Sequence, residues 1–258
     1  MIQKNYVDKD LQSMLLPLNL MQNIMFYPKY SIFNNCIVPN SVLSKVVALC
    51  STMAFVLIHL YRSYNLYYNQ MIREFVNILY ITSYFDIILS CIGFAINFIV
   101  SIYQTENNVL FILKFQKVHR FLNDKNLFNR FVFMNWLILV LLFSFVIFIM
   151  SSFFLYMEVP LPDFFCGLAA FCFDINIIYA LRLIKLLEDK VKLWNFEAQH
   201  LLQIYHSNIE SHCQRMFEAY FNILECYNLY KYSFQLMVCM YGPESLFLRY
   251  FLFHHLRC

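Results

Sequence analysis

Between Arg130 and Glu158 the sequence contains no charged residue and consists almost entirely of apolar side chains. A helix needs about 20 predominantly apolar residues to cross the hydrocarbon core of a bilayer, and irregular backbone exposed to lipid cannot cross it. This run is therefore long enough to span a membrane. With three further apolar stretches, the sequence predicts four transmembrane helices, at about residues 42–61, 76–104, 131–156 and 163–187.

The composition favours a membrane protein over a soluble one. Hydrophobic residues make up 61% of the chain and charged residues only 14%, whereas soluble domains contain about 45–50% apolar and about 25% charged residues. A net charge of +3 is too small to indicate a nucleic-acid partner. The predicted fold class is an all-α integral membrane protein, a multi-pass transmembrane helix bundle whose first partner is the lipid bilayer.

The distribution of Lys and Arg predicts the orientation. These residues gather before the first span, between the second and third, and after the fourth. Only Arg62 and Arg73 lie between the first and second spans, and no basic residue lies between the third and fourth. Because basic loops stay in the cytosol, we expect the N-terminus to be cytosolic. The expected location of this multi-pass protein is the plasma membrane.

The remaining segments are expected outside these four spans. Residues 1–41 form a cytosolic N-terminal segment. In residues 188–233 apolar side chains recur at helical spacing between polar ones, which predicts a cytosolic amphipathic helical hairpin with its turn at His206-Ser207-Asn208. Its apolar stripe packs either on the rest of this chain or on an identical neighbour. Residues 234–258 form an incomplete fifth span, interrupted at Gly242-Pro243-Glu244.

The second span carries a polar face. Small and polar side chains recur there in steps of three and four residues: Ser83, Asp86, Ser90, Gly93, Asn97, Ser101 and Gln104. Lipid does not tolerate such a face, so we expect it to point into the bundle or a wet cavity. Close helix packing accounts for Ser90 and Gly93. Asp86 fits packing less well, because a carboxylate costs about 3 kcal/mol at the centre of a membrane helix.

A small-molecule site is expected between the outer halves of spans two, three and four. Such sites combine apolar walls with a few polar anchors, although aromatic side chains alone are more often part of the core. The candidate ligand-binding residues are Tyr84, Asp86, Phe148, Phe171 and Asp174. In the fourth span Asp174 follows the small residues Gly167 and Ala170 on one face. Arg182 and Lys185, near its end, are expected to reach the cytosolic headgroups.

No motif indicates catalysis. The chain lacks a Gly-rich phosphate loop, a His-Glu-x-x-His pair and a Gly-x-Ser-x-Gly elbow. Its nine cysteines form no Cys-x-x-Cys pair, which is typical of buried apolar residues rather than a disulfide framework or a metal site. We therefore expect no enzyme activity, no cofactor and no metal.

The stretch Phe217–Leu229 contains Tyr220, Ile223, Leu224, Tyr227 and Leu229 in a Tyr-x-x-Ile-Leu-x-x-Tyr-x-Leu pattern. With the cytosolic N-terminus, the short loop after the third span and the long cytosolic extension of the fourth, it resembles the insect chemoreceptor superfamily, in particular the gustatory receptors of moths and butterflies. The resemblance implies a taste receptor subunit of ligand-gated cation channel type, opened by a small-molecule tastant. It also implies a homo- or hetero-oligomer, a tetramer anchored by its cytosolic helices.

Members of that family have about seven helices, and the last one lines the ion pore and carries Thr-Tyr followed by Gln-Phe. The resemblance therefore implies that this chain is C-terminally truncated and incomplete without the pore helix. The alternative function is a small multi-pass transporter or an accessory or structural membrane protein. A transporter is expected to show inverted repeats or helices broken by Gly and Pro, and this chain has only three glycines. A purely structural protein is not expected to carry the long amphipathic hairpin.

Overall fold

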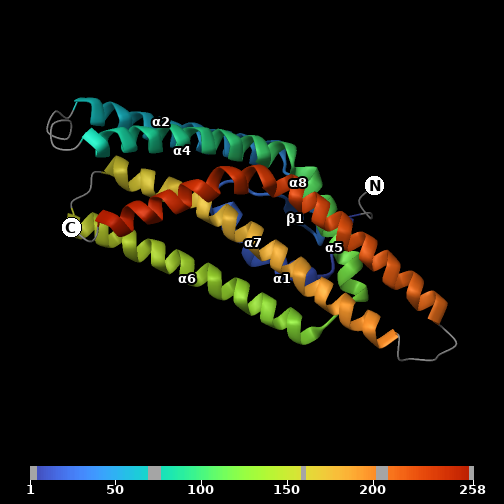
Figure 1. The fold of residues 1–258 in the computed structure, drawn as a ribbon. Helices are drawn as coiled ribbons and strands as arrows, with labels where there is room; N and C mark the ends of the chain where they lie inside the picture. Colours follow the sequence, from blue (N-terminus) through green and yellow to red (C-terminus); the bar gives the residue numbers. More distant parts are fainter. Residues whose placement is uncertain (1–4, 69–76, 158–160, 202–208, 256–258) are drawn as a thin grey trace.

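A computed structural model describes residues 5–68, 77–157, 161–201 and 209–255, and 88% of the structure is helical. The described residues form seven helices and one short pair of strands (Figure 1). The helices are α1 (Lys9–Ile24), α2 (Val42–Tyr68), α4 (Asn77–Tyr103), α5 (Thr105–Phe121), α6 (Lys125–Met157), α7 (Leu161–Leu201) and α8 (Ile209–His255). The predicted all-α class is confirmed for these residues.

The helices form an elongated bundle with α7 at its centre (Figure 1). α2 and α4 lie side by side along one edge, and α6 runs along the opposite edge. α7 passes obliquely between them and contacts α1, α2, α6 and α8. α8 crosses α7 and packs along α5 at the end of the bundle where α7 finishes. One continuous helix therefore touches elements at both ends of the molecule.

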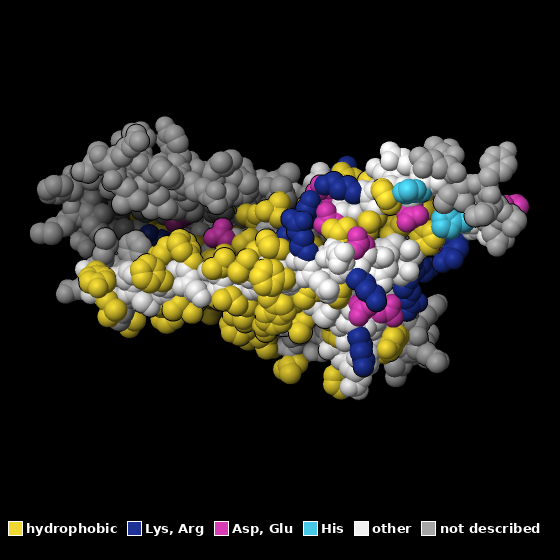
Figure 2. Space-filling view, turned by 90° about the horizontal axis from the view of Figure 1, so that it is seen from below, with side chains coloured by type: hydrophobic (Ala, Val, Ile, Leu, Met, Phe, Trp, Pro, Cys, Tyr) yellow, Lys and Arg dark blue, Asp and Glu magenta, His cyan; other side chains and the backbone are white. Residues whose placement is uncertain are grey.

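Four helices are long and apolar enough to cross a membrane, judged by length and composition. Their candidate spans are Val42–Asn65, Tyr84–Tyr103, Lys125–Ser152 and Phe164–His200, which overlap the four predicted spans. On the face seen in Figure 2, hydrophobic side chains cover one half, and Lys, Arg, Asp and Glu gather at the other end. This face is thus divided into an apolar part and a charged part.

The N-terminal segment is built into the core rather than lying apart from it. α1 has a buried face whose apolar side chains recur every three or four residues: Leu11, Met14, Leu15, Leu18 and Met21. The strands β1 (Ser31–Phe33) and β2 (Cys36–Val38) pair antiparallel across the two-residue turn Asn34-Asn35. Both Asn residues have positive φ, 50° and 61°, as a type I′ turn requires. The sequence analysis did not predict these elements.

Two further differences concern the connection after α4 and the last part of α8. The connection between spans two and three, expected as a loop, is helix α5. The predicted interruption at Gly242-Pro243-Glu244 is wrong, because α8 continues through these residues to His255. Pro243 has no backbone N–H and so cannot donate one of the hydrogen bonds of the helix. The helix nevertheless continues on both sides of it. The predicted turn at His206-Ser207-Asn208 lies outside the described residues.

Candidate functional site

Two of the five predicted ligand-binding residues tie α4 to the end of α2. The Tyr84 hydroxyl donates a hydrogen bond to the Ser63 carbonyl at 3.1 Å. The Asp86 carboxylate lies 3.5 Å from the Arg62 guanidinium. A carboxylate in a membrane helix is tolerated when it has such a charged partner. The structure therefore brings Tyr84 and Asp86 together at one contact between neighbouring helices.

The other three predicted residues lie on α6 and α7. Phe171 is buried on α7, with its ring against Phe143 of α6. Phe148 has 70% of its surface exposed, and Asp174 is also exposed. Phe148 therefore does not form a cavity wall with Phe171. α6 is apolar on nearly all sides, so its sequence gave no means of telling an outward aromatic residue from an inward one.

The polar face predicted for α4 does point inward from Ser90 onward. Ser90, Asn97 and Ser101 are buried, and Asn97 is fully so. Asn97 accepts a hydrogen bond from the side-chain amide of Asn176 on α7 at 3.2 Å. Ser101 donates to the Pro28 carbonyl in the N-terminal segment at 3.4 Å. Polar side chains of α4 thus connect it to two other parts of the fold.

The end of this face reaches α8. The Gln104 side-chain amide donates to the Tyr232 carbonyl at 3.0 Å. Further along, the Lys114 ammonium lies 2.5 Å from the Glu225 carboxylate, so α5 is also tied to α8. These contacts support the interpretation of the polar face as a helix-packing surface. Polar contacts of the same kind continue from α4 to α5 and α8.

A second polar contact, missed in the sequence, joins α6, α7 and α1. Asn135 on α6 donates to the Met14 carbonyl at 3.1 Å and accepts from Nε of Arg182 at 2.7 Å. The Arg182 guanidinium also lies 4.5 Å from the centre of the Phe131 ring. Asn135 and Asn176 were each visible as a single amide in an apolar run. One isolated residue has no periodicity, so that signal alone could not identify a partner.

The charged end contains α5 and the start of α1. The Arg120 guanidinium bonds both carboxylate oxygens of Asp8, at 2.7 and 2.8 Å. This pair holds the pKa of Asp8 below its usual range. The neighbouring His119 is buried, and burial lowers its pKa to about 4, with the positive charge of Lys190 adding to the effect. The helices are therefore held here by both paired charges and a neutral buried histidine.

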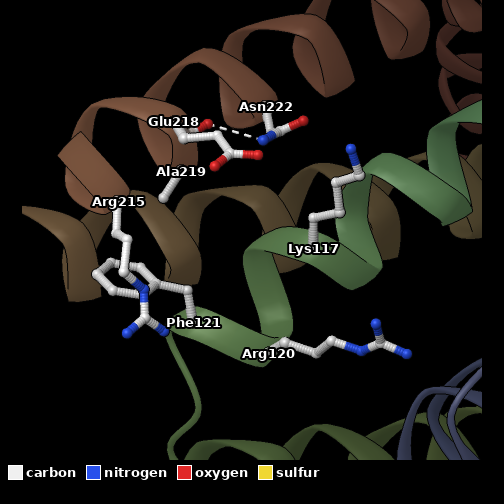
Figure 3. A pocket seen from close by; sticks show the side chains of 7 residues that line it. All are labelled: Lys117, Arg120, Phe121, Arg215, Glu218, Ala219 and Asn222. Atoms are coloured by element: carbon white, nitrogen blue, oxygen red, sulfur yellow. Dashed lines mark hydrogen bonds between the residues drawn. The ribbon is translucent and has the colours of Figure 1, made fainter. Parts of the chain in front are cut away.

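A cavity of about 320 Å³ opens between α5 and α8 (Figure 3). Its lining residues are Lys117, Arg120, Phe121, Arg215, Glu218, Ala219 and Asn222. The Arg215 guanidinium lies 5.1 Å from the centre of the Phe121 ring. Arg120 extends away from α8 towards Asp8, and the Asn222 side chain bonds the Glu218 carbonyl at 2.7 Å. Lys117, Arg215 and the Glu218 carboxylate therefore remain available in the cavity to bind a charged group of another molecule.

The outward side of α8 carries an exposed aromatic surface next to this cavity. We name it the α8 face, and it consists of Phe217, Tyr220, Phe221, Leu224 and Tyr227. The opposite side of the helix is buried: Ile223 packs on Val118 of α5 and on Leu122, which follows that helix. Part of the predicted amphipathic stripe is thus covered within the chain. Tyr227, predicted in the same stripe, stays exposed, and Tyr220 is exposed on one side while its ring centre lies 5.2 Å from that of Trp194 on α7.

Comparison with known proteins gives no family for this chain. No protein-family model, no curated protein and no solved structure matches it. In the part of the chain that the structure describes, no group of three or more His, Cys, Asp or Glu side chains could hold a metal ion. The chemistry available at the charged end is that of ion pairing and aromatic contact, which suits docking of another molecule.

Proposed function

We propose that this chain is a multi-pass protein of the plasma membrane that crosses the bilayer through α2, α4, α6 and α7, with its N-terminus in the cytosol. The division of the face seen in Figure 2 into an apolar and a charged part supports this proposal, as do the four long apolar helices. So does the ion pair of Arg62 with Asp86, which neutralises the charge carried by α4 near its outer end. α1, α5 and the start of α8 then form the cytosolic part.

Within that membrane, the proposed function is that of a receptor subunit for a small-molecule tastant, of the ligand-gated cation channel type. The observation that carries it is the continuity of α7 from Leu161 to Leu201. Asn176 ties this helix to α4, and Arg182 ties it to α6. A shift of its outer end would therefore reach the cytosolic helices without a hinge between them. Tyr84, Asp86 and Asp174 are the proposed polar contacts for the ligand.

The proposed receptor assembles as a homo- or hetero-oligomer, with a tetramer as the expected form. The α8 face supports this part of the proposal, because exposed aromatic patches rimmed by charges are typical of protein interfaces. Arg215 and Glu218 supply such a rim beside Phe217. A neighbouring subunit would cover the aromatic side chains and place its own charges at the cavity between α5 and α8.

Ligand binding tests the receptor proposal without requiring ion conduction. The full chain is purified in detergent, and its melting temperature is measured with a panel of sugars, amino acids and alkaloids. A ligand at about 100 times its Kd stabilises a protein by about 2.7 kcal/mol, so we expect at least one class of tastant to raise the melting temperature. A panel that produces no shift contradicts the receptor function.

A pair of variants separates ligand binding from packing at the same contact. Asp86→Asn removes the proposed anchor, whereas Arg62→Gln keeps the carboxylate and removes its partner on α2. The proposal predicts that Asp86→Asn abolishes the tastant-induced shift and that Arg62→Gln retains it. Equal loss in both variants contradicts the role of Asp86 as an anchor. Membrane insertion is checked separately, because an integral protein stays in the pellet after alkaline carbonate extraction.

The second candidate is an accessory or structural membrane protein. The specific observation in its favour is that Tyr84 and Asp86 both bond to α2, as packing residues would. The described parts of α4, α6 and α7 are also unbroken helices, whereas transporter sites are typically built on interrupted ones. This candidate predicts carbonate-resistant insertion and no tastant-induced shift.

A further inference from the structure

A second cavity, of about 420 Å³, lies between α6 and α7. α6 contributes Leu127, Arg130, Phe131 and Met134, and α7 contributes Arg182, Lys185, Asp189 and Lys192. The lining therefore combines four basic side chains with the three apolar side chains of Leu127, Phe131 and Met134. None of these residues belongs to the proposed tastant contacts or to the α8 face.

The cavity keeps a positive charge after the ion pairs of its two lysines are counted. Lys185 lies 3.0 Å from Glu188 and 3.3 Å from Asp189, and Lys192 also bonds Glu188. Subtracting these two carboxylates from the four basic side chains leaves an excess of two positive charges. These pairs are largely exposed, so each contributes little to stability. An anion entering the cavity can therefore compete for Lys185 and Lys192.

Arg182 is held in place at the cavity by two contacts. Its Nε donates to Asn135, and its guanidinium lies over the Phe131 ring. Such a side chain loses little further freedom when it binds an anion. Arg is also well suited to phosphate, because its planar guanidinium can donate two parallel hydrogen bonds.

The position of the cavity indicates where its occupant comes from. Arg130 immediately precedes the uncharged run of α6, and Lys185 lies at the end of the predicted fourth span. The cavity thus lies at the proposed cytosolic surface of the membrane. On the helix, Leu137 and Leu141 follow Arg130 on the same face at intervals of seven and four residues, and both are exposed. An apolar surface therefore continues from the cavity along the proposed span.

We propose that this cavity binds the phosphorylated headgroup of an anionic phospholipid from the cytosolic leaflet, with the acyl chains along the exposed face of α6. The basic side chains would bind the negatively charged phosphates of the headgroup. The exposed side chains of Leu137 and Leu141 would contact the acyl chains of the lipid. The bound lipid would bridge α6 to α7 beside the contact of Asn135 with Arg182. This proposal rests on the membrane insertion proposed above and is independent of the taste function.

Native mass spectrometry of the purified full chain tests the proposal. The probes are phosphatidylinositol 4-phosphate and, as the uncharged comparison, phosphatidylcholine. We expect retained adducts of the first lipid only. In Arg130→Gln/Lys185→Gln, which leaves Arg182 and its contacts intact, affinity should fall about 30-fold, because each basic residue near an anionic surface contributes about fivefold.

The matched control is Lys45→Gln/Lys231→Gln, which removes the same charge outside the cavity. Lys45 lies at the start of α2, and Lys231 precedes Tyr232, whose carbonyl bonds the end of α4. Equal loss of lipid binding in both double variants overturns the site, since a general charge effect would then suffice. Unchanged binding in Arg130→Gln/Lys185→Gln also overturns it.

The source of the phosphate is decided by competition. Soluble inositol 1,4-bisphosphate carries the same phosphates without the acyl chains. We expect a large excess of it to be needed to displace the lipid. Displacement at equal concentration overturns the lipid assignment in favour of a soluble phosphate ligand. Carbonate extraction of the same preparation shows whether a failure lies instead in the proposed membrane insertion.

Discussion

Asn135 on α6 accepts a hydrogen bond from Nε of Arg182 on α7 at 2.7 Å. The same side chain donates to the Met14 carbonyl of α1 at 3.1 Å. Asn135 is 0% exposed, so both hydrogen bonds are shielded from water. A single amide thus connects α1, α6 and α7.

Replacing this amide should destabilise the fold. Asn135→Ala removes both hydrogen bonds and leaves the Met14 carbonyl and Arg182 without this partner. We expect the free energy of unfolding to fall by about 2 kcal/mol, since unsatisfied buried groups cost about 1–3 kcal/mol and interhelical bonds in membranes about 1 kcal/mol. The measurement is denaturation of the purified chain in detergent.

Asn129→Ala is the control for this prediction, because Asn129 is exposed on the same helix. Exposed substitutions usually change stability by less than about 0.5 kcal/mol. An Asn135→Ala protein as stable as the control would show that the contact between the three helices contributes nothing.

Long patterns in the sequence predicted the larger features correctly. The four apolar runs predicted four long helices, and steps of three and four residues predicted the buried side of α4 through Ser90, Asn97 and Ser101. In each case many residues repeat one signal. The local period of a helix is then sufficient to say which side is buried, although it does not identify the partner helix.

The missed features depend on contacts between distant residues. α1 is too short to span a membrane, and its burial follows from packing on α6 and α7. Phe148 and Phe171 look alike in sequence, yet one is exposed and the other is buried. On a helix that is apolar on every side, no hydrophobic pattern distinguishes the two environments. Only the packing of neighbouring helices decides which aromatic side chain is covered.

Lys29 should destabilise the protein at neutral pH. Its side chain is 2% exposed, and its ammonium finds no hydrogen-bond partner among the described residues. Burial lowers its pKa from 10.5 to about 7. Between these two values the unfolded chain binds the proton and the folded chain does not. Stability therefore rises with pH through this range, by at most about 1.4 kcal/mol per pH unit.

Lys29→Met keeps the length of the side chain and removes the titrating group. We expect a higher melting temperature than the unchanged protein at pH 7, with the difference shrinking as the pH approaches 10. Melting curves in detergent at pH 7, 8.5 and 10 measure this. Lys9→Met, at an exposed position, should leave the pH dependence unchanged. A constant difference between Lys29→Met and the unchanged protein would rule out a buried neutral lysine.

His119 should make the fold sensitive to mild acid. It is 3% exposed, neither ring nitrogen has a hydrogen-bond partner among the described residues, and its pKa is lowered to about 4. Below pH 6.5 the imidazole of residue 119 is protonated in the unfolded chain, whereas in the folded chain it stays neutral down to about pH 4. Stability is thus complete above pH 6.5 and falls between 6.5 and 4, by at most about 1.4 kcal/mol per pH unit.

The variant His119→Phe tests this assignment, because the histidine ring already lies among aromatic rings, stacked on Phe115 and tilted against Phe128. We expect the acid-induced fall in melting temperature between pH 6.5 and 4.5 to become shallower. His212→Phe provides a control on α8. A slope that is unchanged in His119→Phe would assign the acid sensitivity to other groups.

The α8 face should mediate self-association. Phe217 is 70% exposed, so Phe217→Glu adds no buried charge to the subunit, but it would place a carboxylate inside a subunit contact. Charges are depleted from the core of interfaces because their desolvation is costly. We therefore expect Phe217→Glu/Phe221→Glu to run as a monomer in light scattering, with an unchanged melting temperature. Phe33→Glu is the control outside the α8 face, since Phe33 on β1 is as exposed as Phe217. Assembly lost equally in both proteins would place the contact elsewhere, and assembly kept in both would exclude the α8 face from it.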